Sequence, residues 1–204
     1  MFGQEWQTMG VRVLLIAGSL VLWFLTQKMI GARKLEGNAI YDHLHVLTAR
    51  GNAWLHQNPR YANAFLAASS LGVDVVTLFV LVYSIFGPSF TPFWGLFGLF
   101  ALRQLSQATV ALPIPEGVIW RDPGVPSLFV TYGVGNDFFF SGHTALAVYG
   151  AVIVALLGIP ALTIAAALLS VFLVVVVIVL RAHWTMDVVT GLFAALLVGL
   201  IVTI

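Results

Sequence analysis

Long apolar segments constrain this chain more than any other feature of its sequence. A helix needs about 20 predominantly apolar residues to cross a bilayer, because the hydrocarbon core is about 30 Å thick. Six segments of the 204-residue chain approach that length. They cover residues 11–29, 62–86, 92–112, 141–157, 159–180 and 187–204. The sequence therefore predicts an all-α, polytopic membrane protein with six transmembrane helices.

The composition supports the same class. Hydrophobic residues make up 60% of the chain and charged residues 8%, whereas about a quarter of a soluble domain is charged. The formal net charge of +1 gives no attraction for nucleic acid, and a chain without cysteine has no disulfides or thiolate metal sites. No repeat or low-complexity linker divides the sequence, so we expect one membrane domain over residues 1–204.

The segment between the first two spans, "YDHLHVLTARGNAWLHQNPR", is polar with apolar side chains at roughly helical spacing. This pattern is typical of an amphipathic helix on the membrane surface. Its three histidines are His43, His45 and His56. His43 and His45 are two residues apart and do not share a helical face, so we expect no metal site here.

Polar residues at the ends of the spans are the most informative, since an ionised group in hydrocarbon is costly unless it is paired or hydrated. Consecutive spans run in opposite directions, so the end of the third span and the starts of the fourth and sixth lie at the same face of the membrane. The polar residues near those ends include Arg103, Ser141, His143, Arg181, His183 and Asp187. We therefore expect one polar site at that face.

Two histidines of this set suit acid–base and nucleophilic chemistry. His183 and Asp187 are four residues apart and share a helical face if the sixth span begins at or before "HWTMD". A carboxylate placed there accepts a proton from one imidazole nitrogen and leaves the other nitrogen as a nucleophile. His143 lies in the first turn of the fourth span, where backbone N–H groups and the helix dipole favour an anion.

The neighbouring residues suit phosphate binding. Ser141 is a good N-cap for the fourth span, and Gly142 lets the backbone come close to a ligand. Arg103 and Arg181 supply two permanent charges that can hold phosphate oxygens.

Each of these residues also has a structural explanation. Ser141 can cap a helix that happens to carry a histidine, and Arg181 can extend to the membrane interface. Asp74, inside the second span, can pair with Arg103 instead of supporting catalysis. Two histidines, a carboxylate and two arginines at one face of so apolar a chain nevertheless favour a functional site.

The motifs resemble a known family. "NDFFFSGHTA", followed by "RAHWTMDVVTG", resembles the second and third signature motifs of the type 2 phosphatidic acid phosphatase superfamily, and more closely those of its sphingomyelin synthase-like branch. Asp137 stands four residues before Ser141, as in that branch, and Trp184 replaces a tyrosine. The segment "RQLSQATVALPIPEG" is similar to the branch's arginine-led stretch and carries Arg103. The resemblance covers about residues 102–204.

The resemblance implies transfer of a lipid phosphate group without a metal ion or other cofactor. In it, His183 attacks phosphorus, Asp187 orients His183, and His143 protonates the leaving lipid alcohol. Arg103, Arg181, Ser141 and Gly142 hold the charged oxygens, and Asp137 and Asp74 have supporting roles. The substrate is then a phospholipid or lipid phosphate. The resemblance gives no role for Glu116 and no oligomeric state.

Two other functions stay open. Phosphatases of the superfamily carry an arginine six residues before the nucleophilic histidine, where this chain has Val177, so the sequence favours a phosphotransferase over a lipid phosphate or diphosphate phosphatase. A protein that only binds or transports anionic lipids is the alternative from another class. The spans show no inverted repeat that would favour transport.

The expected location is a bacterial inner membrane. The positive-inside rule, taken literally, puts the motif face in the cytoplasm, because of the nine Lys and Arg residues only Arg12 lies at the other face. The resemblance implies a site on the non-cytoplasmic face. Arg103 and Arg181 have a chemical use and are left out of the count, but Lys28, Arg33 and Lys34 lie just beyond the first span, within the range that the rule weighs. We follow the resemblance.

Overall fold

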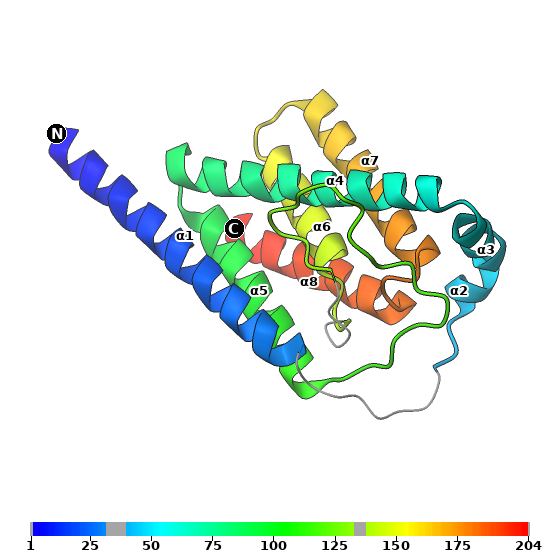
Figure 1. Cartoon of the computed structure of the whole chain (residues 1–204). Coiled ribbons are helices and arrows are strands. Elements are labelled where there is room, and N and C mark those ends of the chain that lie inside the picture. The colour runs from blue at the N-terminus through cyan, green and yellow to red at the C-terminus, as the bar shows by residue number, and fades with distance from the viewer. Residues whose placement is uncertain (1, 32–39, 133–137, 204) are drawn as a thin grey trace.

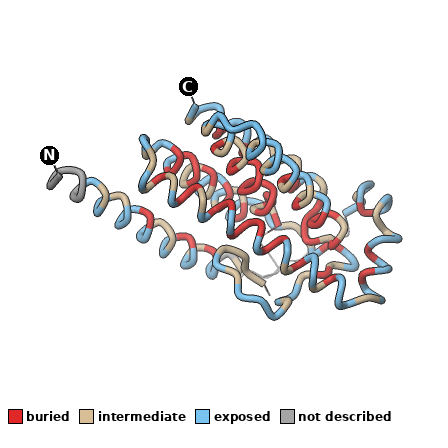
Figure 2. The backbone as a smooth tube through the Cα atoms, turned by 90° about the horizontal axis from the view of Figure 1, so that it is seen from above, coloured by how far each residue is buried: buried red, intermediate tan, exposed pale blue. Residues whose placement is uncertain are grey.

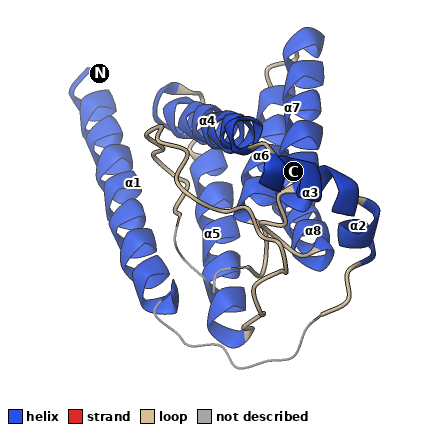
Figure 3. Cartoon of the chain, turned by 45° about the vertical axis from the view of Figure 1, so that its right-hand side comes forward, coloured by secondary structure: helices blue, strands red, loops and turns tan. Residues whose placement is uncertain are grey.

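The computed structural model describes residues 2–31, 40–132 and 138–203, with side chains for all of these except residues 2–7 and 30. Within this part of the chain every regular element is a helix (Figures 1 and 3). The helices are α1 (Phe2–Gly31), α2 (His43–Leu47), α3 (Ala49–Gln57), α4 (Pro59–Phe86), α5 (Thr91–Thr109), α6 (Gly142–Ala155), α7 (Pro160–Val179) and α8 (Thr185–Thr203). The all-α prediction is therefore confirmed.

Four helices are long and apolar enough to cross a membrane: Thr8–Met29 of α1, and α4, α7 and α8. The third and fourth predicted spans are also helical but differ from this standard. α5 has 19 residues, and Arg103, Gln104 and Gln107 make it less apolar. α6 has 14 residues, which extend over about 21 Å and fall short of the hydrocarbon core. Six complete spans therefore stay a prediction.

α6 is the central helix of the fold, and it contacts α4, α5, α7 and α8. Most of its residues are buried, as the burial colouring in Figure 2 shows for the inner helices. Tyr149 is fully buried and its hydroxyl donates to the Pro92 carbonyl at 2.7 Å, which joins α6 to α5.

α1 lies at the edge of the bundle beside α5 and α4 (Figure 1). Only 11% of the residues in its apolar 18-residue segment are buried. Its inner face includes Trp23, which stacks on Phe100 of α5 with ring centroids 5.3 Å apart. At its other end the Arg12 guanidinium donates to the Ile85 carbonyl at 3.1 Å. The rest of α1 presents apolar side chains outward, as expected for a helix in contact with lipid.

The segment predicted as one surface helix forms two helices, α2 and α3. Thr48 is the C-cap of α2, and α3 begins at Ala49. Both contact α7 through buried residues. The Asn52 amide donates to the carbonyls of Val179 at 2.9 Å and Gly117 at 3.0 Å. These bonds attach α3 to the end of α7 and to the long connection between α5 and α6. Their position at the membrane surface stays a prediction.

Candidate active site

His183 lies in the short connection between α7 and α8, and backbone contacts fix its ring. Its Nδ1 is 2.9 Å from the Phe138 carbonyl oxygen, which only accepts, so Nδ1 carries the proton. The Asp187 carboxylate lies 3.6 Å from the same nitrogen. The sequence predicted that Asp187 would accept this proton, whereas in the structure Phe138 accepts it and Asp187 adds a negative charge beside it. Nε2 is left unprotonated, as a nucleophile requires.

Asp187 is fully buried in the first turn of α8 and orders the approach to that helix. Its Oδ2 accepts from the Trp184 backbone N–H at 2.9 Å. Its Oδ1 has no hydrogen-bond partner among the described residues. A buried carboxylate with one unsatisfied oxygen is costly in a purely structural role, because desolvation of a charge needs compensation. Beside a histidine that becomes positive during a reaction, the same charge is stabilising.

The beginning of α6 lies against the beginning of α8. The Ser141 backbone N–H donates to the Asp187 carbonyl at 3.0 Å. Gly191 of α8 allows this approach, because a Cβ at that position would lie 2.7 Å from the Ser141 carbonyl oxygen. The Ser141 hydroxyl accepts from the Thr144 N–H at 3.3 Å and from the Thr144 hydroxyl at 3.1 Å. Ser141 is thus the N-cap that the sequence predicted, and it holds the two motifs together.

His143 and His183 line one cavity with Arg103 and Gly142. The His143 ring meets the Trp120 ring edge to face, with centroids 5.2 Å apart. Its Nε2 is buried without a hydrogen-bond partner in the described part of the chain. An imidazole nitrogen left unpaired in a cavity is available to a ligand. The structure therefore brings together the two histidines that the sequence placed on different spans.

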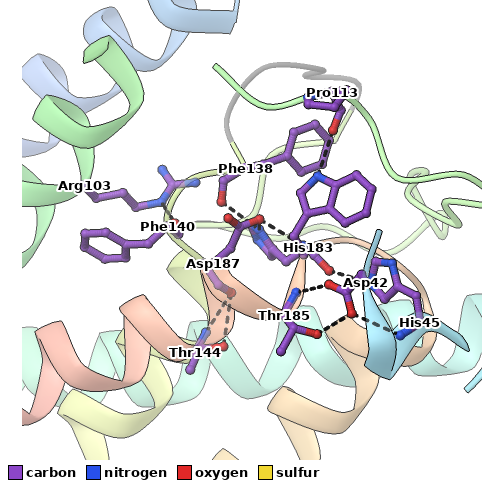
Figure 4. Close-up of polar contacts among 12 residues, drawn as sticks. Asp42, His45, Arg103, Pro113, Phe138, Phe140, Thr144, His183, Thr185 and Asp187 are labelled. Carbon is purple, nitrogen blue, oxygen red and sulfur yellow. Dashed lines mark hydrogen bonds and ion pairs between the residues drawn. The ribbon is translucent and has the colours of Figure 1, made fainter. Parts of the chain in front are cut away.

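Arg103 reaches this cavity from α5 and lies against the first turn of α6 (Figure 4). Its Nε donates to the Phe140 carbonyl at 3.0 Å, and its Nη1 is 3.2 Å from the side-chain oxygens of both Gln27 and Gln107. Gly142 makes room for it, since a Cβ there would lie 3.1 Å from the Arg103 Nε. A buried guanidinium beside a helix N-terminus makes this end of the cavity positive.

Arg181 lies outside the lining of this cavity, so the phosphate-binding role expected for it stays a prediction. Its Nη1 donates to the Glu116 carbonyl at 2.6 Å and its Nη2 to the His45 carbonyl at 3.2 Å. Two backbone carbonyls, which are neutral acceptors, therefore bind its Nη1 and Nη2, whereas its Nε has no hydrogen-bond partner among the described residues. Arg181 joins α2 to the connection after α5, and Glu116 takes part through its backbone.

Asp74 also has a different partner from the one considered for it. Its carboxylate accepts from the Ser127 hydroxyl at 3.1 Å and from the backbone N–H groups of Leu128 at 2.9 Å and Phe129 at 3.0 Å. The carboxylate therefore anchors the connection before α6 to α4, and this contact set supplies its compensation. Asp137, the other supporting residue expected, lies outside the described residues.

Asp42 is a site residue that the sequence analysis missed. Its Oδ1 caps α2 by accepting from the N–H groups of Leu44 at 3.0 Å and His45 at 3.2 Å. The same carboxylate accepts from the Thr185 N–H and the Thr185 hydroxyl, both at 2.6 Å (Figure 4). Burial raises the pKa of Asp42, but the Thr185 hydrogen bonds and the α2 N–H group outweigh burial and lower it. We call this carboxylate bridge between α2 and α8 the Asp42 clamp.

His45 reinforces the Asp42 clamp on the connection between α7 and α8. Its Nε2 donates to the His183 carbonyl at 3.0 Å, and its ring stacks on Trp184 with centroids 5.3 Å apart. The Trp184 indole N–H donates to the Pro113 carbonyl at 2.9 Å. His183 is therefore held on both sides, by its ring and by its backbone.

The comparisons with known proteins give one match. The family model AtPDCT1/2 matches residues 41–203, and this family comprises plant phosphatidylcholine:diacylglycerol cholinephosphotransferases. The chain belongs to the AtPDCT1/2 family. The AtPDCT1/2 match starts beside the Asp42 clamp and includes every element of the site except α1. Comparisons with curated proteins and with solved structures found no match.

AtPDCT1/2 membership agrees with the expected reaction class, because the family acts on lipid headgroups. The four membrane-length helices agree with a lipid substrate in a bilayer. The resemblance to the type 2 phosphatidic acid phosphatase superfamily stays a prediction.

Proposed function

We propose that this protein transfers a phosphate-bearing headgroup from a phospholipid donor to a lipid alcohol through a phosphohistidine at His183. The observation that carries this proposal is the fixed His183 ring. Nδ1–H is bonded to the Phe138 carbonyl, Asp187 lies beside it, and the ring lines the same cavity as His143 and Arg103. The AtPDCT1/2 match supports a headgroup transferase independently of this geometry.

In the first step, the lone pair on His183 Nε2 attacks the phosphorus of the donor, and the bond between phosphorus and the lipid oxygen breaks. His143, which takes up a proton when the anionic phosphate of the donor lies beside it, gives that proton to the leaving oxygen, which departs as a neutral lipid alcohol. The headgroup phosphate is then bonded to Nε2. Asp187 stabilises the positive charge that develops on the His183 ring, and Arg103 stabilises the phosphate oxygens.

In the second step, neutral His143 takes the proton from the acceptor hydroxyl. The hydroxyl oxygen attacks phosphorus, and the bond between phosphorus and Nε2 breaks with its electron pair returning to His183. Both histidines regain their starting protonation, so the enzyme turns over without a net gain or loss of protons. A hydroxyl group of a lipid or of water balances this step equally, so the acceptor decides between transfer and hydrolysis.

The family name points to phosphocholine as the headgroup and diacylglycerol as the acceptor. We propose this pair as the first substrates to test. Purified protein in detergent with EDTA is incubated with phosphatidylcholine labelled in its headgroup and with an unlabelled diacylglycerol of different chain length. We expect labelled phosphatidylcholine with the new chains from the wild type, and none from His183→Ala. His43→Ala is the matched control, because His43 is an exposed residue of α2.

Three results would change the proposal. Release of free phosphocholine without an acceptor would make the protein a phosphodiesterase-type hydrolase. Equal activity in His183→Ala and the wild type would exclude His183 as the nucleophile. Lipid binding without turnover by either protein, across a panel of phospholipids and lipid phosphates, would favour a binding or transport role.

The site is proposed to open on the non-cytoplasmic face of the bacterial inner membrane. The chain has no cysteine, so a single introduced thiol reports one position. Val125→Cys marks the exposed connection over the site, and Ser89→Cys marks the exposed turn at the opposite ends of α4 and α5. In intact cells, an impermeant maleimide should label the first variant and spare the second. The reverse pattern would place the site in the cytoplasm.

A further inference from the structure

An apolar groove runs between α1 and α5 and meets the active-site cavity. Its lining includes Leu20, Trp23, Phe97, Phe100, Ala101 and Gln104. Trp23 and Phe100 line both the groove and the cavity. The groove lies on helices that face the bilayer, because α1 is a membrane-length helix exposed along most of its surface. It therefore connects the lipid environment with the site.

Two buried polar atoms at this junction lack hydrogen-bond partners within the described ranges: the Trp23 indole nitrogen and the Gln104 side-chain oxygen. Trp23 is only 7% exposed. The Gln104 amide donates to Gln27 Oε1 at 3.3 Å, and Arg103 Nη1 contacts the same oxygen at 3.2 Å. A row of polar groups thus leads from the guanidinium in the cavity to the wall of the groove. Unpaired buried polar groups of this kind are expected to meet a ligand.

We propose that this groove binds an ester-linked acyl chain of the glycerolipid substrate, with the ester carbonyl accepting from the Trp23 N–H. The identity of the ligand rests on the proposed lipid transfer. In a glycerolipid, the acyl ester lies a few bonds from the headgroup oxygen, so an ester at Trp23 agrees with a phosphate at Arg103. The apolar residues beyond Trp23 then contact the hydrocarbon chain. The family match includes the α5 wall of the groove and does not extend to α1.

A second apolar groove offers a control. It lies among α6, α7 and α8, includes Ala167, and shares no lining residue with the active-site cavity. Its polar residues Ser170 and Thr163 are satisfied, because the Ser170 hydroxyl bonds the carbonyls of Ala147 at 3.0 Å and Ala166 at 2.9 Å, and the Thr163 hydroxyl bonds the Ile159 carbonyl at 3.2 Å. Lipid there has no polar anchor and no path to His183. Ala101→Trp fills the first groove and Ala167→Trp the second, and both alanines are exposed in the structure.

The test uses a phosphatidylcholine with a diazirine in one acyl chain, reconstituted in nanodiscs with the full chain carrying His183→Ala. After illumination, peptide mass spectrometry maps the labelled residues. The label forms without turnover, so the result does not depend on whether the proposed headgroup transfer occurs. We expect the label on α1 and α5 residues of the groove, reduced at least about fivefold by Ala101→Trp and unchanged by Ala167→Trp. Equal labelling of both grooves, or no effect of Ala101→Trp, would show boundary lipid only and overturn the proposal.

Trp23→Phe tests the polar contact separately, because it keeps the aromatic ring and removes the N–H group. A single neutral hydrogen bond changes binding by about two- to tenfold. We expect the diacyl probe to lose affinity by that factor in Trp23→Phe, and the corresponding ether-linked probe to change less. The same loss for both probes would exclude recognition of the ester carbonyl.

Discussion

Removing one oxygen of the Asp42 clamp should impair catalysis although Asp42 does not touch the cavity. Asp42 Oδ1 accepts three hydrogen bonds, from the N–H groups of Leu44 and His45 and from the Thr185 hydroxyl. Asp42 Oδ2 accepts one hydrogen bond, from the Thr185 N–H. Asp42→Asn can keep its oxygen at the Oδ1 position and then presents an NH₂ group to the Thr185 N–H. The substitution therefore preserves the α2 cap and breaks one contact with α8.

The expected cost follows from that single bond. A hydrogen bond to a charged group contributes about 1.5–3 kcal/mol, and partial exposure of Asp42 reduces this to about 1–2 kcal/mol. Asp42→Ala also loses the α2 cap, which is typically about 1 kcal/mol more, and the bond from the Thr185 hydroxyl. Thr185 lies two residues from both His183 and Asp187. A shift of about 1 Å in a reacting group can cost about a hundredfold in rate, so we expect kcat to fall at least about tenfold with little change in KM.

The assay is headgroup transfer in detergent together with thermal unfolding of each variant. Asp122→Asn is the matched control, because the exposed Asp122 carboxylate accepts only from the nearby Gly124 N–H among the hydrogen bonds resolved. Since the pKa of Asp42 is lowered in the folded protein, its stabilisation is present above about pH 4 and is lost as the pH falls through the folded value. Wild type and Asp42→Asn should therefore converge in stability at acid pH. Unchanged kcat in Asp42→Asn, within twofold, would refute a positioning role.

Two further substitutions test the contacts around the cavity. Arg103→Lys replaces the planar guanidinium with a single ammonium group, which cannot both bond the Phe140 carbonyl and hold a phosphate with two N–H groups. KM for the phospholipid donor should therefore rise about tenfold, while His183 still forms a phosphohistidine. An unchanged KM would exclude phosphate binding by Arg103. Gly191→Ala places a methyl group 2.7 Å from the Ser141 carbonyl oxygen and should lower the unfolding free energy by about 1–3 kcal/mol. Gly98→Ala meets no described atom within 4 Å and should leave stability and activity unchanged, and equal effects of the two alanines would contradict this packing.

The sequence was sufficient to predict that the motifs meet. Charged and polar residues are conspicuous in an apolar chain, and alternating span directions put the end of α5 and the beginnings of α6 and α8 at one face. The backbone bond from Ser141 to Asp187 and the bond from Arg103 to Phe140 confirm that convergence. The Ser141 cap could also be predicted, since it depends on residues within one helical turn.

The partners of long-range polar contacts could not be predicted. Asp42 was missed altogether, because its second oxygen contacts Thr185, 143 positions further along the chain. Arg181 and Asp74 were noticed for their charge. Backbone groups, which carry no sequence signal, are the partners found for Arg181 and supply two of the three donors to Asp74. The length of α6 was overestimated for a related reason, because apolar residues continue past the end of the helix and hydropathy alone does not mark that end.

The most direct test of the account is the search for a covalent intermediate on His183. The wild type is mixed with headgroup-labelled phosphatidylcholine without an acceptor, quenched at alkaline pH to preserve phosphoramidates, digested and analysed by mass spectrometry. The account predicts a phosphocholine adduct on the peptide that contains His183, its loss when diacylglycerol is added before quenching, and its absence in His183→Ala. Transfer that proceeds at full rate with no adduct on His183, or with the adduct on His143, would contradict the central claim.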